Sequence, residues 1–260
     1  MSITLSVIGG GNMARAIIKG VISAELLSPD NIAVADPEIS CRDFYDNLGC
    51  LSVTNSSELP KSEVTLLAIK PQIFDKIETS FNSNTVFSIM AGVGTQKIAA
   101  SIGHSRIVRI MPNLPCSIGY GATGITAGKS AKDEDVSFAK DIFSSIGIVV
   151  EVTEDQMDAV TAISGSGPAY LFLLVESMIE GGIKSGLTRE AATALAQQTV
   201  LGASELLLRD QRGASELREA VTSKGGTTAA ALQVMNERKV PKAIEDAIIS
   251  ARDRGRELGN

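Results

Sequence analysis

The chain has 260 residues, 44% of them hydrophobic, and it carries a formal net charge of −6 with a pI near 5.0. This acidic balance and an aromatic content of only 4% exclude a protein that binds nucleic acid through a basic surface or stacks bases on aromatic platforms. Three cysteines without C-x-x-C spacing argue against a disulfide framework or a zinc site. We therefore expect no metal and a reducing, cytoplasmic location.

We also expect neither a signal peptide nor a membrane span. The N-terminus lacks a basic region and enters an apolar run at once, and the longest apolar run, residues 169–175, ends at Glu176. The one histidine, His104, lies in a polar connection between a helix and a strand, where we interpret it as a surface residue. A Ser-His-Asp triad or a histidine-based metal site therefore has no support in the sequence.

A glycine-rich turn follows the first predicted strand. Residues 3–8 form a short apolar, β-rich run, and apolar residues recur at helical spacing over residues 13–21. Between them, Gly9, Gly11 and Ala14 fit the pattern G-x-G-x-x-A of dinucleotide-binding turns. Such a turn lets the backbone approach a pyrophosphate, to which the helix N-terminus offers free N–H groups. An ordinary tight turn is the alternative, but the position at the start of a strand–helix unit favours dinucleotide binding.

Strand-like and helix-like segments alternate as far as residue 152. Each short apolar run ends in a turn rich in glycine, proline or polar residues. The segments expected as strands are 3–8, 32–35, 51–53, 64–69, 86–90, 107–111, 120–127 and 147–152. Helices are expected over 38–48 and 131–145, and Thr95 is expected to cap a further one. This alternation predicts an α/β fold with a mainly parallel, doubly wound sheet and helices on both faces.

Several polar residues follow the predicted strands directly. In a doubly wound sheet, the carboxyl ends of the strands face the ligand crevice. Asp36 ends the second strand, where an acidic side chain usually holds the ribose of NAD; its alternative role is to cap the next helix ahead of Pro37. Lys70 and Pro71 break the fourth strand, which places Lys70 where phosphate or ribose would lie, unless it is simply an exposed lysine. Asn113 lies in a proline-rich loop after the sixth strand.

The character of the sequence changes near residue 153, and no strand is expected after it. Helical patterns cover 155–163, 168–185, 189–209, 214–222, 228–237 and 240–257. The pattern over 168–185 is apolar on nearly every face, as in a helix that is buried on all sides. Because so much alanine-rich helix would pack poorly alone, we predict that this half intertwines with a second copy of the chain. We expect two domains, residues 1–153 and residues 154–260.

Two short segments of the second half combine glycines with hydroxyl side chains just before a helix starts. They are residues 164–168, Ser-Gly-Ser-Gly-Pro, and residues 221–228, Val-Thr-Ser-Lys-Gly-Gly-Thr-Thr. Backbone N–H groups at a helix N-terminus favour a carboxylate, and neighbouring hydroxyls add donors. Simple helix capping uses the same residue types and is the alternative. Two such segments in one domain exceed what capping requires, so we predict ligand contact at 221–228.

The chain resembles pyrroline-5-carboxylate reductase, the last enzyme of proline biosynthesis. The matching stretches, in the order in which the family has them, are IGGGNMA at 8–14, AIKPQ at 68–72, RIMPN at 109–113, SGSGPAY at 164–170 and VTSKGGTT at 221–228. The resemblance implies an N-terminal Rossmann-like domain, an all-α C-terminal dimerisation domain, and reduction of 1-pyrroline-5-carboxylate to L-proline by hydride from NAD(P)H. The expected partners are this small molecule and the chain itself, as a homodimer or higher homo-oligomer, with neither nucleic acid nor membrane.

The resemblance also implies roles for individual residues. Thr228 would be the catalytic residue, with its hydroxyl hydrogen-bonded to the ring nitrogen of the imine. The substrate would be held by Ser166, Ser223, Gly225, Gly226, Thr227 and Thr228. The cofactor would be held by Gly9, Gly11, Asn12, Met13, Asp36, Asn55, Ala68, Lys70, Pro71 and Asn113. Because a protonated imine is already electrophilic, its reduction needs orientation rather than a strong acid, in agreement with the lack of a catalytic histidine.

The chain departs from the family's pattern at two places. Lys224 stands where many members have proline, in a loop that tolerates change. Asp36-Pro37-Glu38 is acidic, and a carboxylate beside a 2′-phosphate is repulsive, although Ser40 and Arg42 could compensate. We expect NADP(H), with NAD(H) as the competing cofactor.

Two other functions are alternatives to the reductase. One is a β-hydroxyacid dehydrogenase-like enzyme, with Lys184 as its candidate catalytic lysine, and the other is a non-catalytic nucleotide sensor.

Overall fold

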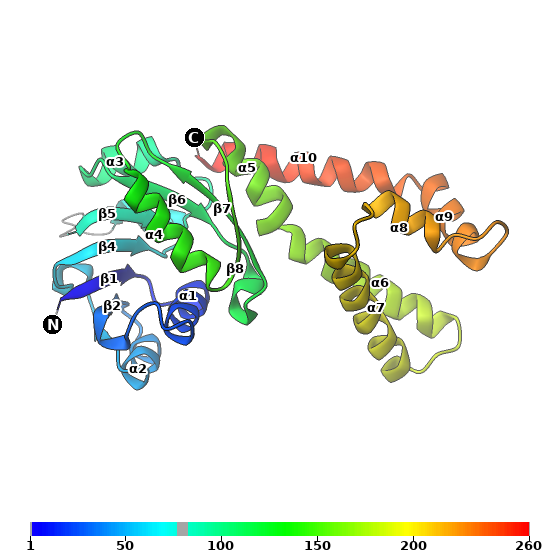
Figure 1. Ribbon diagram of the computed structural model, residues 1–260, viewed down its shortest axis with the longest axis horizontal. Coiled ribbons are helices and arrows are strands. Elements are labelled where there is room, and N and C mark those ends of the chain that lie inside the picture. The colour runs from blue at the N-terminus through cyan, green and yellow to red at the C-terminus, as the bar shows by residue number, and fades with distance from the viewer. Residues whose placement is uncertain (1, 77–82, 260) are drawn as a thin grey trace. The chain divides into compact units, whose positions relative to one another are not determined.

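The computed structural model describes residues 2–76 and 83–259 (Figure 1). Its internal contacts divide the chain into two compact units. The first consists of Met1–Ser166 together with Ile249–Asn260, and the second consists of Gly167–Ile248. The domain boundary that we expect between residues 153 and 154 differs from these bounds and stays a prediction.

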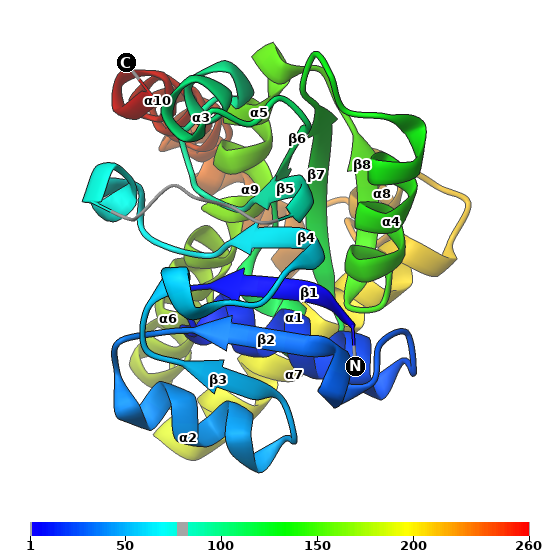
Figure 2. The ribbon, with the colours of Figure 1, turned by 90° about the vertical axis from the view of Figure 1, so that its left-hand side faces the viewer.

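An eight-stranded sheet forms the centre of the first unit (Figure 2). Its strands are β1 (Ile3–Ile8), β2 (Ile32–Ala35), β3 (Leu51–Val53), β4 (Ser62–Leu67), β5 (Ser83–Ser88), β6 (Ile107–Met111), β7 (Gly121–Ala127) and β8 (Gly147–Glu151). They lie in the order β3-β2-β1-β4-β5-β6-β7-β8. Strands β1 to β6 are parallel, whereas β7 is antiparallel to β6 and parallel to β8. The expected mainly parallel, doubly wound sheet is confirmed, and its first six strands have the order typical of dinucleotide-binding domains.

Helices cover both faces of this sheet. They are α1 (Asn12–Ser23), α2 (Ile39–Asn47), α3 (Thr95–Ile102) and α4 (Asp133–Ser144), and after β8 the short α5 (Met157–Val160) leads into a π-helical turn over Thr161–Gly165. Successive strand residues point to opposite faces, so Leu66 packs in a core with α1 and α4 while Leu67 packs in a second core with α3. Alternating burial of this kind fixes the register of the strands and therefore the position of the sheet's carboxyl edge.

Thr95 does not cap α3, so that expectation is wrong. The helix begins at Thr95 with Gly94 as its N-cap, and the Thr95 hydroxyl donates instead to Oε2 of Glu154 at 2.9 Å. Glu154 also accepts a hydrogen bond at 2.7 Å from the guanidinium of Arg109, a buried residue of β6. A carboxylate oxygen of Asp158 lies 3.5 Å from the same guanidinium. These contacts join β6 and α3 to the segment that follows β8.

The second unit consists of helices. They are α6 (Gly167–Lys184), α7 (Arg189–Arg209), α8 (Ala214–Ala220), α9 (Thr227–Glu237) and the first part of α10 (Val240–Gly259). Helices α6 and α7 pack together, and a Cβ atom on Gly182 of α6 would lie 3.1 Å from that of Ala192, so glycine permits their close approach. In this unit, every residue of which the structure describes, the buried residues are Ala192 and Ala196.

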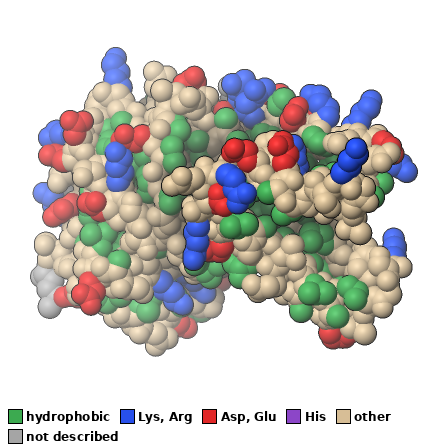
Figure 3. Space-filling view, turned by 45° about the vertical axis from the view of Figure 1, so that its right-hand side comes forward, with side chains coloured by type: hydrophobic (Ala, Val, Ile, Leu, Met, Phe, Trp, Pro, Cys, Tyr) green, Lys and Arg blue, Asp and Glu red, His purple; other side chains and the backbone are tan. Residues whose placement is uncertain are grey.

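Helix α6 exposes its apolar side chains instead of burying them. No residue of this fully described helix is buried, and Leu173 is 64% exposed. The expectation of burial on all sides therefore does not hold in a single chain. By length and composition, the helical run Glu154–Lys184 could even cross a membrane. Figure 3 shows apolar side chains on the surface of the helical part. An apolar surface of this extent marks an interaction site.

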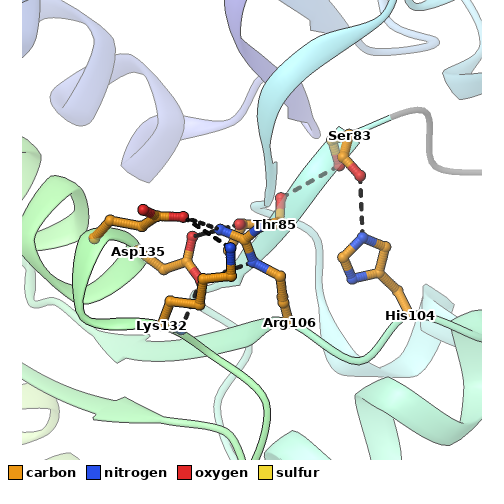
Figure 4. A network of polar contacts seen from close by, with 7 residues as sticks. Ser83, Thr85, His104, Arg106, Lys132 and Asp135 are labelled. Carbon is orange, nitrogen blue, oxygen red and sulfur yellow. Dashed lines mark hydrogen bonds and ion pairs between the residues drawn. The ribbon is translucent and has the colours of Figure 1, made fainter.

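An ion pair occupies the opposite, amino edge of the sheet (Figure 4). Asp135 of α4 accepts hydrogen bonds from Nε and Nη2 of Arg106, from the hydroxyl of Thr85 and from the backbone N–H of Lys132. Burial disfavours the charged carboxylate, but these hydrogen bonds outweigh it and lower the pKa of Asp135. His104, which we expected at the surface, is half-buried, with Nε2 3.0 Å from the carbonyl oxygen of Ser83.

Replacing Asp135 by asparagine is expected to destabilise the first unit by about 2–3 kcal/mol at pH 7, because Arg106 loses its buried counter-charge. The pKa of Asp135 is lower in the folded than in the unfolded chain. Its contribution is therefore present above the unfolded value of about 4 and is lost as the pH falls through the folded value. Melting temperatures of wild type and variant should converge at acidic pH. The exposed Asp133 provides the control: equal losses from Asp133→Asn and Asp135→Asn at pH 7 would contradict this account.

Candidate active site

The glycine-rich turn lies at the carboxyl end of β1, between β2 and β4, where the strand order reverses direction. Ligands of such sheets bind in the crevice at this point. Gly9 has a φ of +97°, and a Cβ there would lie 2.6 Å from the carbonyl oxygen of Ala68, so the position requires glycine. Gly11 is exposed with open space where a Cβ would point. Asn12 and Met13 then begin α1, whose first N–H groups have no partner within the helix.

The carboxylate of Asp36 points into this turn from the end of β2. It is 9% exposed; its Oδ2 accepts a hydrogen bond from the N–H of Gly10 at 2.6 Å and its Oδ1 accepts one from the N–H of Glu38 at 2.9 Å. The N-cap of α2 is Glu38, so Asp36 does not cap that helix. On the other side of the turn, the hydroxyl of Tyr45 donates to the carbonyl oxygen of Gly10 at 2.9 Å. The role of Asp36 toward the ribose stays a prediction.

Two arginines place positive charge beside the end of β2. The guanidinium of Arg42 donates to the carbonyl oxygens of Asp36 and Pro37, each at 2.8 Å. The guanidinium of Arg15 in α1 reaches the carbonyl oxygen of Ser40 at 3.4 Å. An arginine in this region is the usual partner of the 2′-phosphate of NADP. The acidic character of residues 36–38 is therefore balanced locally.

The ends of β3 and β4 bring further predicted cofactor residues to the same edge. Ala68 and Lys70 follow β4, the strand that pairs with β1, and Lys70 is exposed. Pro71 begins a 3₁₀ turn over Pro71–Lys76. Asn55 follows β3, where its amide donates to Oε1 of Glu58 at 2.6 Å. Because parallel strands end at one edge, these residues and the glycine turn share it.

Asn113 uses both ends of its side-chain amide within the protein. Its Nδ2 donates to the carbonyl oxygen of Ser164 at 3.1 Å, and its Oδ1 accepts from the N–H of Ala122 at 3.0 Å. In a regular helix the Ser164 carbonyl would accept from residue 168, but Pro168 has no N–H. Asn113 thus supplies the donor that proline lacks. The side chain is 7% exposed, and its role as a cofactor ligand stays a prediction.

The predicted substrate segment forms a tight turn between α8 and α9. Gly225 has a φ of +73°, and the N–H of Gly226 donates to the carbonyl oxygen of Ser223 at 3.0 Å. Thr227 and Thr228 are the first residues of α9, whose N-cap is Gly226. The turn therefore places a serine hydroxyl close to the free N–H groups of a helix start, which suits an anion such as a carboxylate. Ser166, the remaining predicted substrate residue, is the last residue of the N-terminal segment of the first unit.

The sequence did not predict the role of Tyr45, and it did not predict the ion pairs of Arg109. Tyr45 is fully buried, and its partner Gly10 lies 35 residues earlier in the chain, so no local pattern connects them. Arg109 appears in a matched stretch, but its ion pairs with the segment after β8 were not foreseen. A charged residue inside an apolar strand was the available signal, since buried charges need partners.

Comparison with known proteins identifies the family. Residues 4–92 match the family of NADP oxidoreductases described as coenzyme F420-dependent, and residues 154–258 match pyrroline-5-carboxylate reductase dimerisation. A pyrroline-5-carboxylate reductase of Synechocystis sp. is 42% identical to the chain, with 100% of this chain and 99% of the relative aligned. The chain belongs to the pyrroline-5-carboxylate reductase family. Another pyrroline-5-carboxylate reductase, from Haemophilus influenzae, is 40% identical over 98% of this chain and 97% of its own length.

Solved structures of pyrroline-5-carboxylate reductases have the same fold. The structure from Coxiella burnetii is 35% identical, with a TM-score of 0.90 over 100% of both chains. The structure from Plasmodium falciparum, which has NADP bound, is 30% identical, with a TM-score of 0.88 over 99% of this chain and 98% of its own. The Rossmann-like fold with a helical second half and the family resemblance are thus both confirmed.

Proposed function

We propose that this chain reduces 1-pyrroline-5-carboxylate to L-proline with hydride from NADPH, the final step of proline biosynthesis. The observation that carries this function is the full-length similarity to pyrroline-5-carboxylate reductases at 42% identity. The dehydrogenase acting on β-hydroxyacids and the nucleotide sensor lack such support. Neither of them requires the Ser223–Thr228 turn, which the helical unit builds with two glycines and three hydroxyl side chains.

The carboxyl edge of the sheet fits a dinucleotide. Gly9 leaves no room for a side chain and Gly11 leaves open space above the start of α1, so a pyrophosphate can approach the backbone N–H groups of Asn12 and Met13. Gly9, Asn55, Ala68, Lys70, Pro71 and Asn113 would line the remainder of the cofactor groove, with Asp36 at its ribose end. Arg42 and Arg15 supply the positive charge that favours a 2′-phosphate, in support of NADPH over NADH. The bound cofactor supplies the hydride.

The turn before α9 would hold the substrate. We assign its carboxylate to Ser223, Gly225, Gly226 and Thr227, largely through backbone N–H groups, with Ser166 as a further contact. The hydroxyl of Thr228 would then meet the ring nitrogen, orient the iminium ion and share its proton. Since the protonated imine already attracts hydride, the protein needs no stronger acid. Orientation is therefore the main catalytic contribution of these residues.

A second copy of the chain would cover exposed apolar side chains of α6. The chain carries the family's dimerisation region over residues 154–258, and Leu171, Phe172 and Leu173 of α6 are each about half exposed or more in a single chain. Burial of these side chains on dimerisation would be strongly favourable. We assign the protein to a homodimer or higher homo-oligomer in the cytoplasm, where its three free cysteines would stay reduced.

The decisive test follows the initial rate of NADPH and NADH oxidation with 1-pyrroline-5-carboxylate as substrate. We expect NADPH to be oxidised with a higher specificity constant than NADH. With a β-hydroxyacid as substrate, we expect no reduction of NADP+ or NAD+, which a dehydrogenase acting on such acids would catalyse. The variant Arg42→Ala should lower the ratio of the specificity constant for NADPH to that for NADH, because the 2′-phosphate loses a cationic partner. If a folded, dimeric sample consumes neither cofactor, the proposed function is wrong. A higher specificity constant for NADH would instead overturn the assignment of NADPH.

A further inference from the structure

Gly10, the middle residue of the glycine turn, is held by side chains on both sides. Its N–H donates to the buried carboxylate of Asp36 at 2.6 Å, and its carbonyl oxygen accepts from the hydroxyl of Tyr45 at 2.9 Å. The residue is also enclosed sterically, since a Cβ there would lie 2.8 Å from a ring carbon of Tyr45 and 3.3 Å from the Cβ of Asp36. The two peptide groups that flank Gly10 are thereby fixed in direction.

These contacts determine which backbone groups remain for a ligand. Because Asp36 takes the N–H of Gly10, that group is not available to a phosphate. The N–H groups left for a ligand at this turn are then those at the N-terminus of α1, which have no partner within the helix. Their direction depends on the peptide planes before them. A small rotation at Gly10 would turn them away from the pyrophosphate.

Both side chains are suited to hold this geometry steadily. Burial raises the pKa of Tyr45, so its hydroxyl keeps its proton and remains a donor at any physiological pH. The carboxylate of Asp36 is an acceptor only, and each of its oxygens faces a backbone N–H. Tyr45 has no exposed surface and Asp36 is 9% exposed, so neighbouring atoms enclose both side chains.

We propose that Tyr45 and Asp36 are positioning residues for the cofactor, which clamp Gly10 so that the start of α1 presents its N–H groups to the pyrophosphate. This inference rests on the proposed function, since it requires that NADPH bind at the glycine turn. It gives Asp36 a role at the turn beneath the phosphates in addition to the one proposed for it at the ribose. It also gives a role in cofactor binding to a buried tyrosine that need not touch the cofactor.

The test is direct titration of full-length, dimeric protein with NADPH, followed by steady-state kinetics. Tyr45→Phe removes one hydroxyl and leaves the ring in place; we expect the Kd for NADPH to rise about five- to tenfold. The turnover number at saturating NADPH and the KM for the imine should stay unchanged. In Asp36→Asn, the side-chain N–H₂ faces a backbone N–H, and two donors cannot form a hydrogen bond. This variant should therefore lower the affinity for NADPH more than Tyr45→Phe does. The control is Tyr120→Phe, at a tyrosine that is 67% exposed.

The outcomes separate the clamp from a purely structural role and from the proposed function. A lower melting temperature of Tyr45→Phe with wild-type affinity for NADPH would overturn the clamp. So would a loss of turnover at saturating NADPH without a change in Kd. If Asp36→Asn does not fold, Tyr45→Phe alone decides. If the wild-type protein itself does not bind NADPH, the proposed function fails, and the clamp fails with it.

Discussion

Replacing Thr228 by alanine is expected to lower the turnover number about a hundredfold, the usual contribution of a positioned side chain that shares a proton with the reacting group. The hydroxyl is the group that we assign to the imine nitrogen, and alanine leaves that nitrogen without a partner. Thr228 is the second residue of α9, where the loss of a side-chain methyl and hydroxyl should leave the helix and its N-cap, Gly226, intact. Affinity for NADPH should be nearly unchanged, because the residues that we propose for the cofactor all belong to the first unit, whereas Thr228 belongs to the second.

The matched variant is Thr228→Ser, which keeps the hydroxyl and loses only the methyl group. It should retain most of the turnover number. Measurement of kcat over a range of pH, with NADPH titrated separately, distinguishes loss of the hydroxyl's role at the imine nitrogen from loss of cofactor binding. An unchanged kcat in Thr228→Ala would refute the catalytic role. Equal losses in the alanine and serine variants would point to packing rather than to the hydroxyl.

Introducing an arginine at Leu173 is expected to dissociate the proposed dimer and to abolish most of the activity. Leu173 is one of the exposed apolar side chains of α6 and is 64% exposed in a single chain. If a second copy covers it, the new charge is buried in the interface at a cost of several kcal/mol, and twofold symmetry places it there twice. Sedimentation equilibrium at micromolar concentration should then show a monomer where the wild type is a dimer.

A control for this variant is Gln211→Arg, which adds the same charge at an exposed position between α7 and α8. It should leave both the dimer and the activity intact. A dimer that persists in Leu173→Arg would show that the interface lies elsewhere on the helical unit. The thermal unfolding of the first unit serves as an internal reference, since its core does not include α6.

The order and type of the elements could be predicted because each strand of the sheet is short, apolar and closed by a turn signal. Residues 107–111 illustrate this: the apolar run stops at Pro112, and the structure has β6 over the same residues. The direction of β7 could not be predicted from the run 120–127. A strand that returns antiparallel has the same alternation of side chains as a parallel one, and only tertiary contacts decide between them.

The residues of the candidate site also differ in whether the sequence could predict them. Glycines whose backbone conformation excludes a side chain, such as Gly9 and Gly225, leave a signal in the sequence because few other residues tolerate a positive φ. The partners of Asp36 could not be predicted, because the sequence is the same whether a carboxylate at the end of a strand faces a ribose or a backbone N–H. The apolar character of α6 was visible, but one chain alone does not contain the surface that would bury it.

The position of the C-terminal part of α10 affects the design of chimeras and truncations in this family. Residues 249–260 belong to the first unit, and a Cβ on Gly255 would lie 3.4 Å from Oδ1 of Asp158. The helical unit is therefore inserted into the first unit and joined to it at two points of the chain, rather than attached to its end at one point. A chimera between relatives would need crossovers near both residue 166 and residue 248, and a chain trimmed at its C-terminus would lose part of its nucleotide-binding half.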